Sequence, residues 1–102
     1  MNNIEAGKLF LPFLEHPYYR KHGGYVVSDP DGTHIGVVGR NTGTTHIIEN
    51  LLLCAGEHFD VSLTVSSLDI HTPSNNPPEV VAILKDMNGD EYTIILIHTY
   101  IY

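Results

Sequence analysis

The sequence is short of cysteine, tryptophan, charge and long apolar runs, and these shortages exclude several classes of protein. Its single cysteine, Cys54, rules out an intrachain disulfide and a cysteine-rich zinc site. No apolar run reaches the roughly 18 residues that a membrane-spanning helix needs. The opening MNNIEAGKLF also lacks the basic region and long apolar stretch of a signal peptide. We therefore expect a cytoplasmic protein.

The charge is small in amount and negative in balance. Charged residues make up 17% of the chain, and 12 acidic residues against 5 basic ones give a formal net charge of −7. This balance repels phosphate backbones and anionic lipids, so binding to a nucleic-acid polymer or a membrane is disfavoured. A surface with little charge leaves uncharged or apolar area that often contacts a partner, and we expect a homo-oligomer.

The 102 residues, 42% of them hydrophobic, are predicted to form a single domain, 1–102, around one core. A first helix is expected with Asn3 as its N-cap. Pro12 should end or kink this helix, so we predict that it reaches about Phe10 and is followed by a turn. Its apolar stripe would consist of Ile4, Phe10, Leu11 and Leu14.

The middle of the chain changes from a hairpin pattern to a helical one and back to a strand. Residues 25–39 hold two β-rich runs around Asp29-Pro30-Asp31-Gly32, where proline presets a type I turn and glycine supplies the positive φ. Residues 45–56 predict a helix of about ten residues that Gly56 caps. From residue 59 to residue 66, apolar and polar residues alternate as in a strand with one buried face.

The C-terminal part predicts a second hairpin, because Asn88-Gly89 separates the β-rich runs 79–86 and 91–102. Together the patterns predict an α+β fold: an antiparallel sheet of about five strands, made of a hairpin plus a three-stranded meander, with two short helices. The last strand is apolar on both faces, so it should lie centrally in the sheet or against another subunit. The interface predicted on this strand consists of Leu96, His98, Tyr100 and Tyr102.

Four of the seven histidines lie in Thr-His-Ile or Ile-His-Thr triplets, namely His34, His46, His71 and His98. In a strand such a triplet puts the isoleucine and the histidine on opposite faces, so His34 is expected on the wetter face of the first hairpin. The histidine spacing does not match a metal site, and we predict neither a metal nor another cofactor; the least unsuitable ligands would be His34, His71 and His98. His98, and His58 beside Glu57, are candidate general bases of a small hydrolase or phosphodiesterase.

The segment HPYYRKHGGY, residues 16–25, combines basic residues, tyrosines and a Gly-Gly pair. Tyrosine rings can stack on a base, arginine and lysine can hold a phosphate, and glycines allow close approach of the backbone. Arg40 precedes a predicted helix start, whose free N–H groups favour an anion. A site for a nucleotide or another phosphorylated small molecule is therefore predicted at Tyr18, Tyr19, Arg20, Lys21 and Arg40.

Two short stretches resemble parts of known families. GRNTGTT, residues 39–45, resembles the pyrophosphate loop of acetyl-CoA-dependent N-acetyltransferases, although Thr45 stands where that loop ends in glycine or alanine. Residues 25–39 are similar to the strand-turn-strand hairpin of glyoxalase-type metalloenzymes, although Gly36 occupies the position of their glutamate ligand. Neither stretch is long enough to indicate a family.

Three hypotheses of function follow. The first is a small acidic, non-enzymatic binding module, a homo-oligomer that inhibits or sequesters a protein target, as phage-encoded or plasmid-encoded inhibitors and immunity proteins do. The second is a binder of a nucleotide or phosphorylated small molecule. The third is the histidine-dependent hydrolase or phosphodiesterase. We favour the first because the chain carries no recognisable catalytic motif.

Overall fold

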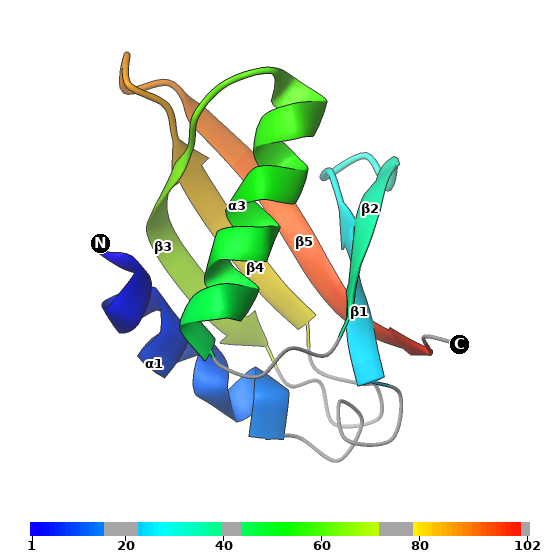
Figure 1. Cartoon of the computed structure of the whole chain (residues 1–102). Coiled ribbons are helices and arrows are strands. Elements are labelled where there is room, and N and C mark those ends of the chain that lie inside the picture. The colour runs from blue at the N-terminus through cyan, green and yellow to red at the C-terminus, as the bar shows by residue number, and fades with distance from the viewer. Residues whose placement is uncertain (16–22, 40–43, 72–78, 101–102) are drawn as a thin grey trace.

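The computed structural model describes residues 1–15, 23–39, 44–71 and 79–100. These residues form two helices and five strands, in the order α1 (Asn3–Glu15), β1 (Gly23–Ser28), β2 (His34–Gly39), α3 (Thr44–Phe59), β3 (Thr64–His71), β4 (Glu79–Lys85) and β5 (Glu91–Tyr100) (Figure 1). The strands form one antiparallel sheet in the order β2-β1-β5-β4-β3. The predicted α+β class, with a hairpin and a meander, is confirmed, and β5 lies at the centre of the sheet.

Helix α1 begins with a reciprocal pair of hydrogen bonds. The Glu5 backbone N–H donates to Asn2 Oδ1 at 2.8 Å, and Asn2 Nδ2 donates back to Glu5 Oε1 at 3.1 Å. The first bond is a helix N-cap, in which the Asn2 side chain accepts from a backbone N–H of the first turn, and the second joins the two side chains. The N-cap is therefore Asn2, and the prediction of Asn3 was wrong by one residue.

Helix α1 also continues through Pro12 to Glu15, beyond the predicted end at Phe10. Proline in a helix costs about 3 kcal/mol, and the aromatic packing of the helix offsets it. Phe10 and Phe13 are fully buried, and their ring centroids lie 5.5 and 5.8 Å from that of Tyr25 in β1. Burying large aromatic side chains stabilises by about 2–3 kcal/mol each.

The buried face of α1 differs from the predicted stripe. Ala6, Phe10 and Phe13 face the core, whereas Ile4 and Leu11 are 62% and 39% exposed. Leu14 was also part of the predicted stripe, and its side chain is not among those that the structure describes. Because the aromatic residues carry more apolar area than the aliphatic ones, they determine the rotation of the helix on the sheet.

Helix α3 ends one turn later than predicted. It continues past Gly56 to Phe59, and Asp60 then adopts a left-handed conformation with φ of 58°. The Val61 N–H donates to the Gly56 carbonyl at 3.1 Å, which closes a Schellman motif. A Cβ on Gly56 would lie 2.8 Å from the Val61 carbonyl oxygen, so this glycine allows the returning chain to approach the helix.

Strand β3 begins at Thr64, so the strand predicted from Phe59 was wrong over its first five residues. Its alternation is also interrupted, because the pairing with β4 shifts between Val65 and Ser67. The extra residue of this β-bulge reverses the alternation of faces. Val65 and Leu68 are therefore both buried although three positions separate them.

The two hairpin turns use the same chemistry. The β1–β2 turn begins at Asp29 and the β4–β5 turn at Asp86, and in each the aspartate Oδ1 accepts backbone N–H bonds from the residues two and four positions later, at 2.8–3.0 Å. The fourth residue of each turn is a glycine with positive φ, 87° at Gly32 and 85° at Gly89. Both predicted turns are confirmed.

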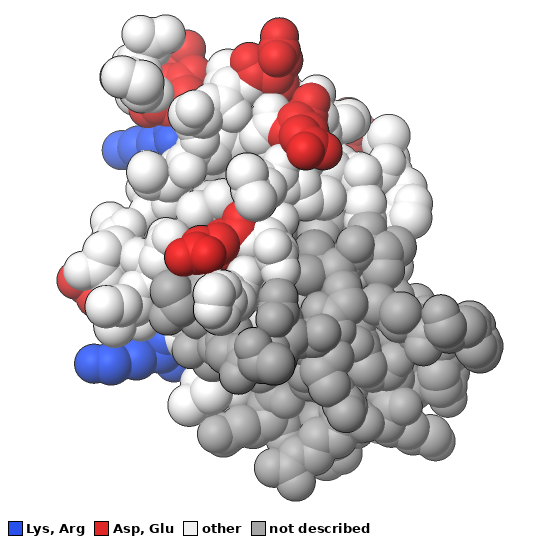
Figure 2. Space-filling model, in the orientation of Figure 1, with Lys and Arg blue, Asp and Glu red and all other residues white. Residues whose placement is uncertain are grey.

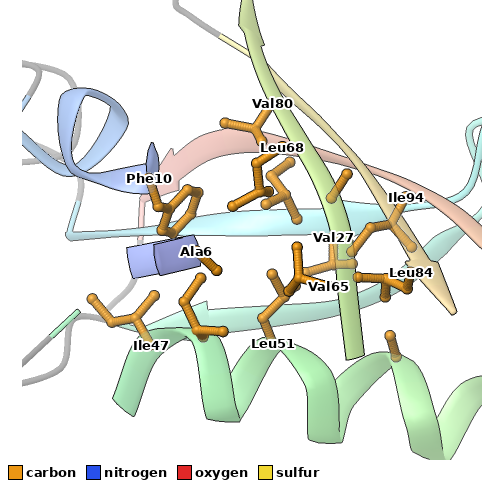
Figure 3. Packing of buried hydrophobic residues seen from close by; sticks show 14 of the residues in the cluster. Ala6, Phe10, Val27, Ile47, Leu51, Val65, Leu68, Val80, Leu84 and Ile94 are labelled. Carbon is orange, nitrogen blue, oxygen red and sulfur yellow. The ribbon is translucent and has the colours of Figure 1, made fainter. Parts of the chain in front are cut away.

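The core lies between the helices and one face of the sheet (Figure 3). Helix α1 packs against α3 and β3, and α3 packs against β2, so both helices cover the same side. The fully buried core residues of largest volume are Tyr25, Phe10, Phe13, Ile48, Leu51, Leu84, Ile94, Leu96, Val27, Val65 and Val80. Neither of the described helices is sufficiently long and apolar to cross a membrane.

The strained C-terminus of α3 gives a test of the fold. Replacing Asp60 with glycine should raise the free energy of unfolding by about 1 kcal/mol, because glycine adopts positive φ without a Cβ penalty. Gly56→Ala should lower it, because the new Cβ would meet the Val61 carbonyl. Asp60→Asn serves as the control that removes only the charge. Chemical denaturation of the three variants measures the effects, and a destabilised Asp60→Gly variant would contradict the assignment.

Candidate functional site

Within residues 1–15, 23–39, 44–71 and 79–100, no helix or strand covers the face of the sheet opposite the helices. In β4 the side chains of Val80, Ala82 and Leu84 are fully buried beneath the helices. The alternate residues Val81 and Ile83 are only half-buried, because alternation along a strand directs them to the other face. The same alternation continues in β5 and β1.

The half-buried aliphatic side chains on the uncovered face form one patch. In register, Val26 of β1 lies opposite Ile97 of β5, and Ile95 lies opposite Val81 of β4. Ile97 is 40% exposed although it lies in the central strand. We call these residues the open-face patch: Val26, Val81, Ile83, Ile95 and Ile97.

Polar residues on the same face lie next to the patch. Ser28 Oγ lies 3.5 Å from the Ile95 carbonyl oxygen, to which it donates, and Thr93 lies opposite Ile83. At one end of the sheet Lys85 lies opposite Glu91 in register. The patch itself is aliphatic, so it offers no group for acid–base or nucleophilic chemistry. Its side chains are β-branched and stiff, which lowers the entropy lost when they contact another surface.

Three members of the predicted interface, Leu96, His98 and Tyr100, lie at alternate positions of β5, and Tyr102 lies outside the described residues. Leu96, one of its members, is fully buried in the core beneath the helices. The backbone of His98 lies opposite Tyr25, but the side chains of His98, Tyr100 and Tyr102 lie outside the described ones. For these three residues the interface stays a prediction. The sequence did carry the signal for the open-face patch, because the strand is apolar at both sets of alternate positions.

The predicted ligand site, Tyr18, Tyr19, Arg20, Lys21 and Arg40, lies outside the described residues. The structure does describe the residues between which its two segments run. Gly23 begins β1 directly after residues 16–22, Gly39 ends β2 directly before residues 40–43, and Gly24 pairs with Gly39. The two segments are therefore attached to adjacent positions of one hairpin.

The histidines suggested as metal ligands do not converge. His34 begins β2 at one edge of the sheet, and His71 ends β3 at the other edge. Four strand spacings of about 4.8 Å separate these edges, roughly 19 Å in total, so His34 and His71 cannot bind one ion. His34 is exposed, as predicted. Within the described ranges, no group of three or more His, Cys, Asp or Glu residues is placed to hold a metal ion.

Glu57 and His58, suggested as an acid–base pair, are consecutive residues on the last turn of α3. The helix directs the two side chains about 100° apart. Both side chains are exposed, and the His58 ring instead contacts the Phe59 ring edge-to-face, with centroids 4.8 Å apart. This arrangement does not favour a role of the two residues as a catalytic pair.

Cys54 lies where α3 packs against β2. A Cβ on Gly36 would lie 2.6 Å from Cys54 Sγ, so the strand can approach the helix only because Gly36 has no side chain. The thiol is half-buried. Burial, and next the nearby Glu57 carboxylate, raise the pKa of Cys54 above its usual value of 9.0, because both disfavour the thiolate.

Comparison of the chain with protein-family models, with curated proteins and with solved structures gives no match. The function proposed below is therefore inferred from the residues and geometry of this chain.

The raised pKa of Cys54 predicts a slowly reacting thiol. Only the thiolate reacts with iodoacetamide, so alkylation of the folded protein at pH 8 should be at least about threefold slower than alkylation of the urea-unfolded protein. The rate should rise steeply only above pH 9. Because the folded state binds the thiol proton more tightly, this group's contribution to stability is present below pH 9 and is lost as pH rises through the folded pKa. Equal rates in the two states would contradict the prediction.

Proposed function

We propose that this protein is a small, acidic, non-enzymatic binding module that self-associates through the open-face patch. The observation that supports the proposal is the uncovered apolar centre of the sheet, where Ile97 of the middle strand is 40% exposed. Exposed contiguous apolar area of this kind marks a contact surface, because leaving it in water is unfavourable.

The size of the face fits a reversible dimer. Five strands about 4.8 Å apart, each about seven residues long with a rise of about 3.3 Å, span a plane of roughly 500 Å². A standard interface buries about 800 Å² on each partner, and weaker transient ones bury less than about 600 Å². Self-association through this face alone should therefore be modest in affinity.

Face-to-face packing of two such sheets gives a four-layer dimer with the two sheets inside and the helices outside. Sheets pack about 10 Å apart, with their side chains interdigitated. The aliphatic side chains of the open-face patch suit this arrangement. The helix layers of both copies then remain accessible, so a homo-oligomer of this type presents two equivalent surfaces with which to inhibit or sequester a protein target.

A charge placed in the patch should prevent self-association. Ile97→Glu is expected to weaken dimerisation at least about 100-fold, because an unpaired carboxylate would be buried between the sheets. Its effect on monomer folding should be small, since the site is exposed in the monomer. Sedimentation velocity over a range of concentrations measures the association constant, and circular dichroism checks the fold.

Two further variants keep this test specific. Leu9→Glu changes a 46% exposed leucine of α1 and should leave dimerisation unchanged. The double variant Tyr100→Ser and Tyr102→Ser tests the interface predicted from the sequence. A wild-type protein that remains monomeric at several hundred micromolar, or an Ile97→Glu variant that still dimerises, would overturn self-association through the patch.

A second candidate function is binding of a nucleotide or phosphorylated small molecule. The strand register supports it, because Gly24 pairs with Gly39 and the segments bearing Arg20, Lys21 and Arg40 are attached beside one another. Two basic segments far apart in the sequence are thus tied to one end of one hairpin. Cations gathered there would hold a phosphate group.

Ribonucleotides at millimolar concentration should then raise the melting temperature of the protein. A ligand present at 100 times its Kd stabilises by about 2.7 kcal/mol, or a shift of roughly 10 °C for a domain of this size. The double variant Arg20→Ala and Arg40→Ala should lose the shift, whereas Lys8→Ala, on the first helix, should keep it. Differential scanning fluorimetry measures the shift, and an equal shift in the double variant would reject the site.

A further inference from the structure

A second surface lies on the helix side of the molecule. A groove with a volume of about 790 Å³ lies between the start of α1, the outer side of α3 and the loop that leads into β3. It follows α3 from Glu49 to Glu57, which is about 12 Å at a rise of 1.5 Å per residue. Neither this groove nor its residues belong to the open-face patch.

Apolar residues and carboxylates both line the groove, and we call its carboxylates the acidic rim. Leu52, Leu53 and Leu63 are among its apolar residues, and Leu53 is 63% exposed although it is one of the largest aliphatic side chains on the helix layer. The rim carries three exposed carboxylates: Glu49, Glu57 and Asp60. An apolar groove bordered by carboxylates is complementary to an amphipathic segment that carries basic side chains.

The charges of the rim are not neutralised by lysine or arginine on the described part of the chain. The basic side chains described there are Lys8 and Lys85, and neither lines the groove. His46 approaches Glu49 at 3.5 Å, between two exposed side chains. Figure 2, which views the molecule from the side of α3, shows acidic side chains spread over the described surface and basic ones only at its margin.

Two of the rim carboxylates also lie at the unfavourable end of α3. The C-terminus of a helix carries a partial negative charge, which repels nearby carboxylates. Glu57 lies in the last turn of α3, and Asp60 directly follows the last residue of the helix, Phe59. The helix terminus therefore adds to the negative potential of the rim. A cation bound there would reduce the repulsion between the carboxylates and their repulsion by the helix terminus.

We propose that the groove binds a basic amphipathic segment of a partner protein. Apolar side chains of the segment would cover Leu53 and Leu52, and its lysine or arginine side chains would pair with the rim carboxylates. This inference rests on the proposed function only in that the chain acts by binding a protein; it does not require self-association. In the sheet-to-sheet dimer each copy would present one groove on its outer side.

The probe is a fluorescent peptide of about 14 residues, with leucines at helical i, i+3, i+4 and i+7 spacing and lysines elsewhere. Fluorescence anisotropy gives its Kd, and ¹H–¹⁵N chemical-shift changes locate its site. We expect binding in the micromolar range that weakens with salt, and shifts centred on residues 49–63. A peptide with glutamate in place of lysine, and one of the same composition in scrambled order, should bind at least about tenfold more weakly.

Variants of the groove decide the assignment. Leu53→Ser should weaken binding about tenfold, and Glu57→Gln with Asp60→Asn about fivefold, because the first removes apolar contact and the second removes ion pairs. The matched controls Leu9→Ser and Glu5→Gln remove the same kinds of group from exposed positions of α1 and should bind normally. Equal binding of the scrambled peptide, unchanged binding to Leu53→Ser, or shifts centred on the open-face patch would each overturn the proposal.

The monomeric Ile97→Glu variant separates this inference from the proposed self-association. It should bind the peptide with unchanged affinity, because Ile97 lies on the opposite face of the sheet from the helices. A dimeric protein that fails the groove tests would overturn the groove alone. A monomeric protein that passes them would leave the groove standing and overturn the dimer.

Discussion

The aromatic contact between α1 and β1 decides which face of the sheet is covered. Phe10 and Phe13 stack with ring centroids 5.1 Å apart, and both meet the Tyr25 ring at a steep angle. Helix α3 packs beside α1 on the same face, where Ile48 and Leu51 complete the core. Because both helices lie on one side, no described helix or strand covers the aliphatic side chains on the other side of the central strands. The exposed patch is therefore a consequence of how the core is built.

The face of the sheet suits self-association better than its β3 edge does. An edge strand with a regular, flat ladder can pair with another chain, but a bulge twists the edge and interrupts its hydrogen bonds. Edge strand β3 carries such a bulge between Val65 and Ser67, and exposed Asp69 follows on the same strand. The apolar surface is concentrated instead on β1, β5 and β4, at the middle of the open face.

Much of the fold could be predicted from local patterns, because local chemistry controls them. The two Asp-x-x-Gly turns and the alternation in β4 and β5 depend on neighbouring residues. The misplaced boundaries depend on tertiary contacts. Helix α1 continues past Pro12 because its aromatic rings are buried against β1, and helix α3 continues past Gly56, against which the chain returns at Val61. The site was less predictable. Residues 94–97 are apolar at both sets of alternate positions, and only the location of the helices shows that Leu96 is buried and Ile97 exposed.

Asp60 links the stability of the fold with the proposed groove. Its left-handed conformation is one that glycine adopts without strain, and its charge lies beside the negative end of α3. On both grounds aspartate is a poor residue for ending this helix, so the requirements of the fold do not explain it. A cation bound at the groove would reverse the electrostatic part of that cost, because it would pair with Asp60 and screen the helix terminus together. The same residue would then weaken the isolated monomer and strengthen its complex, as expected when a binding surface is built at the expense of local stability.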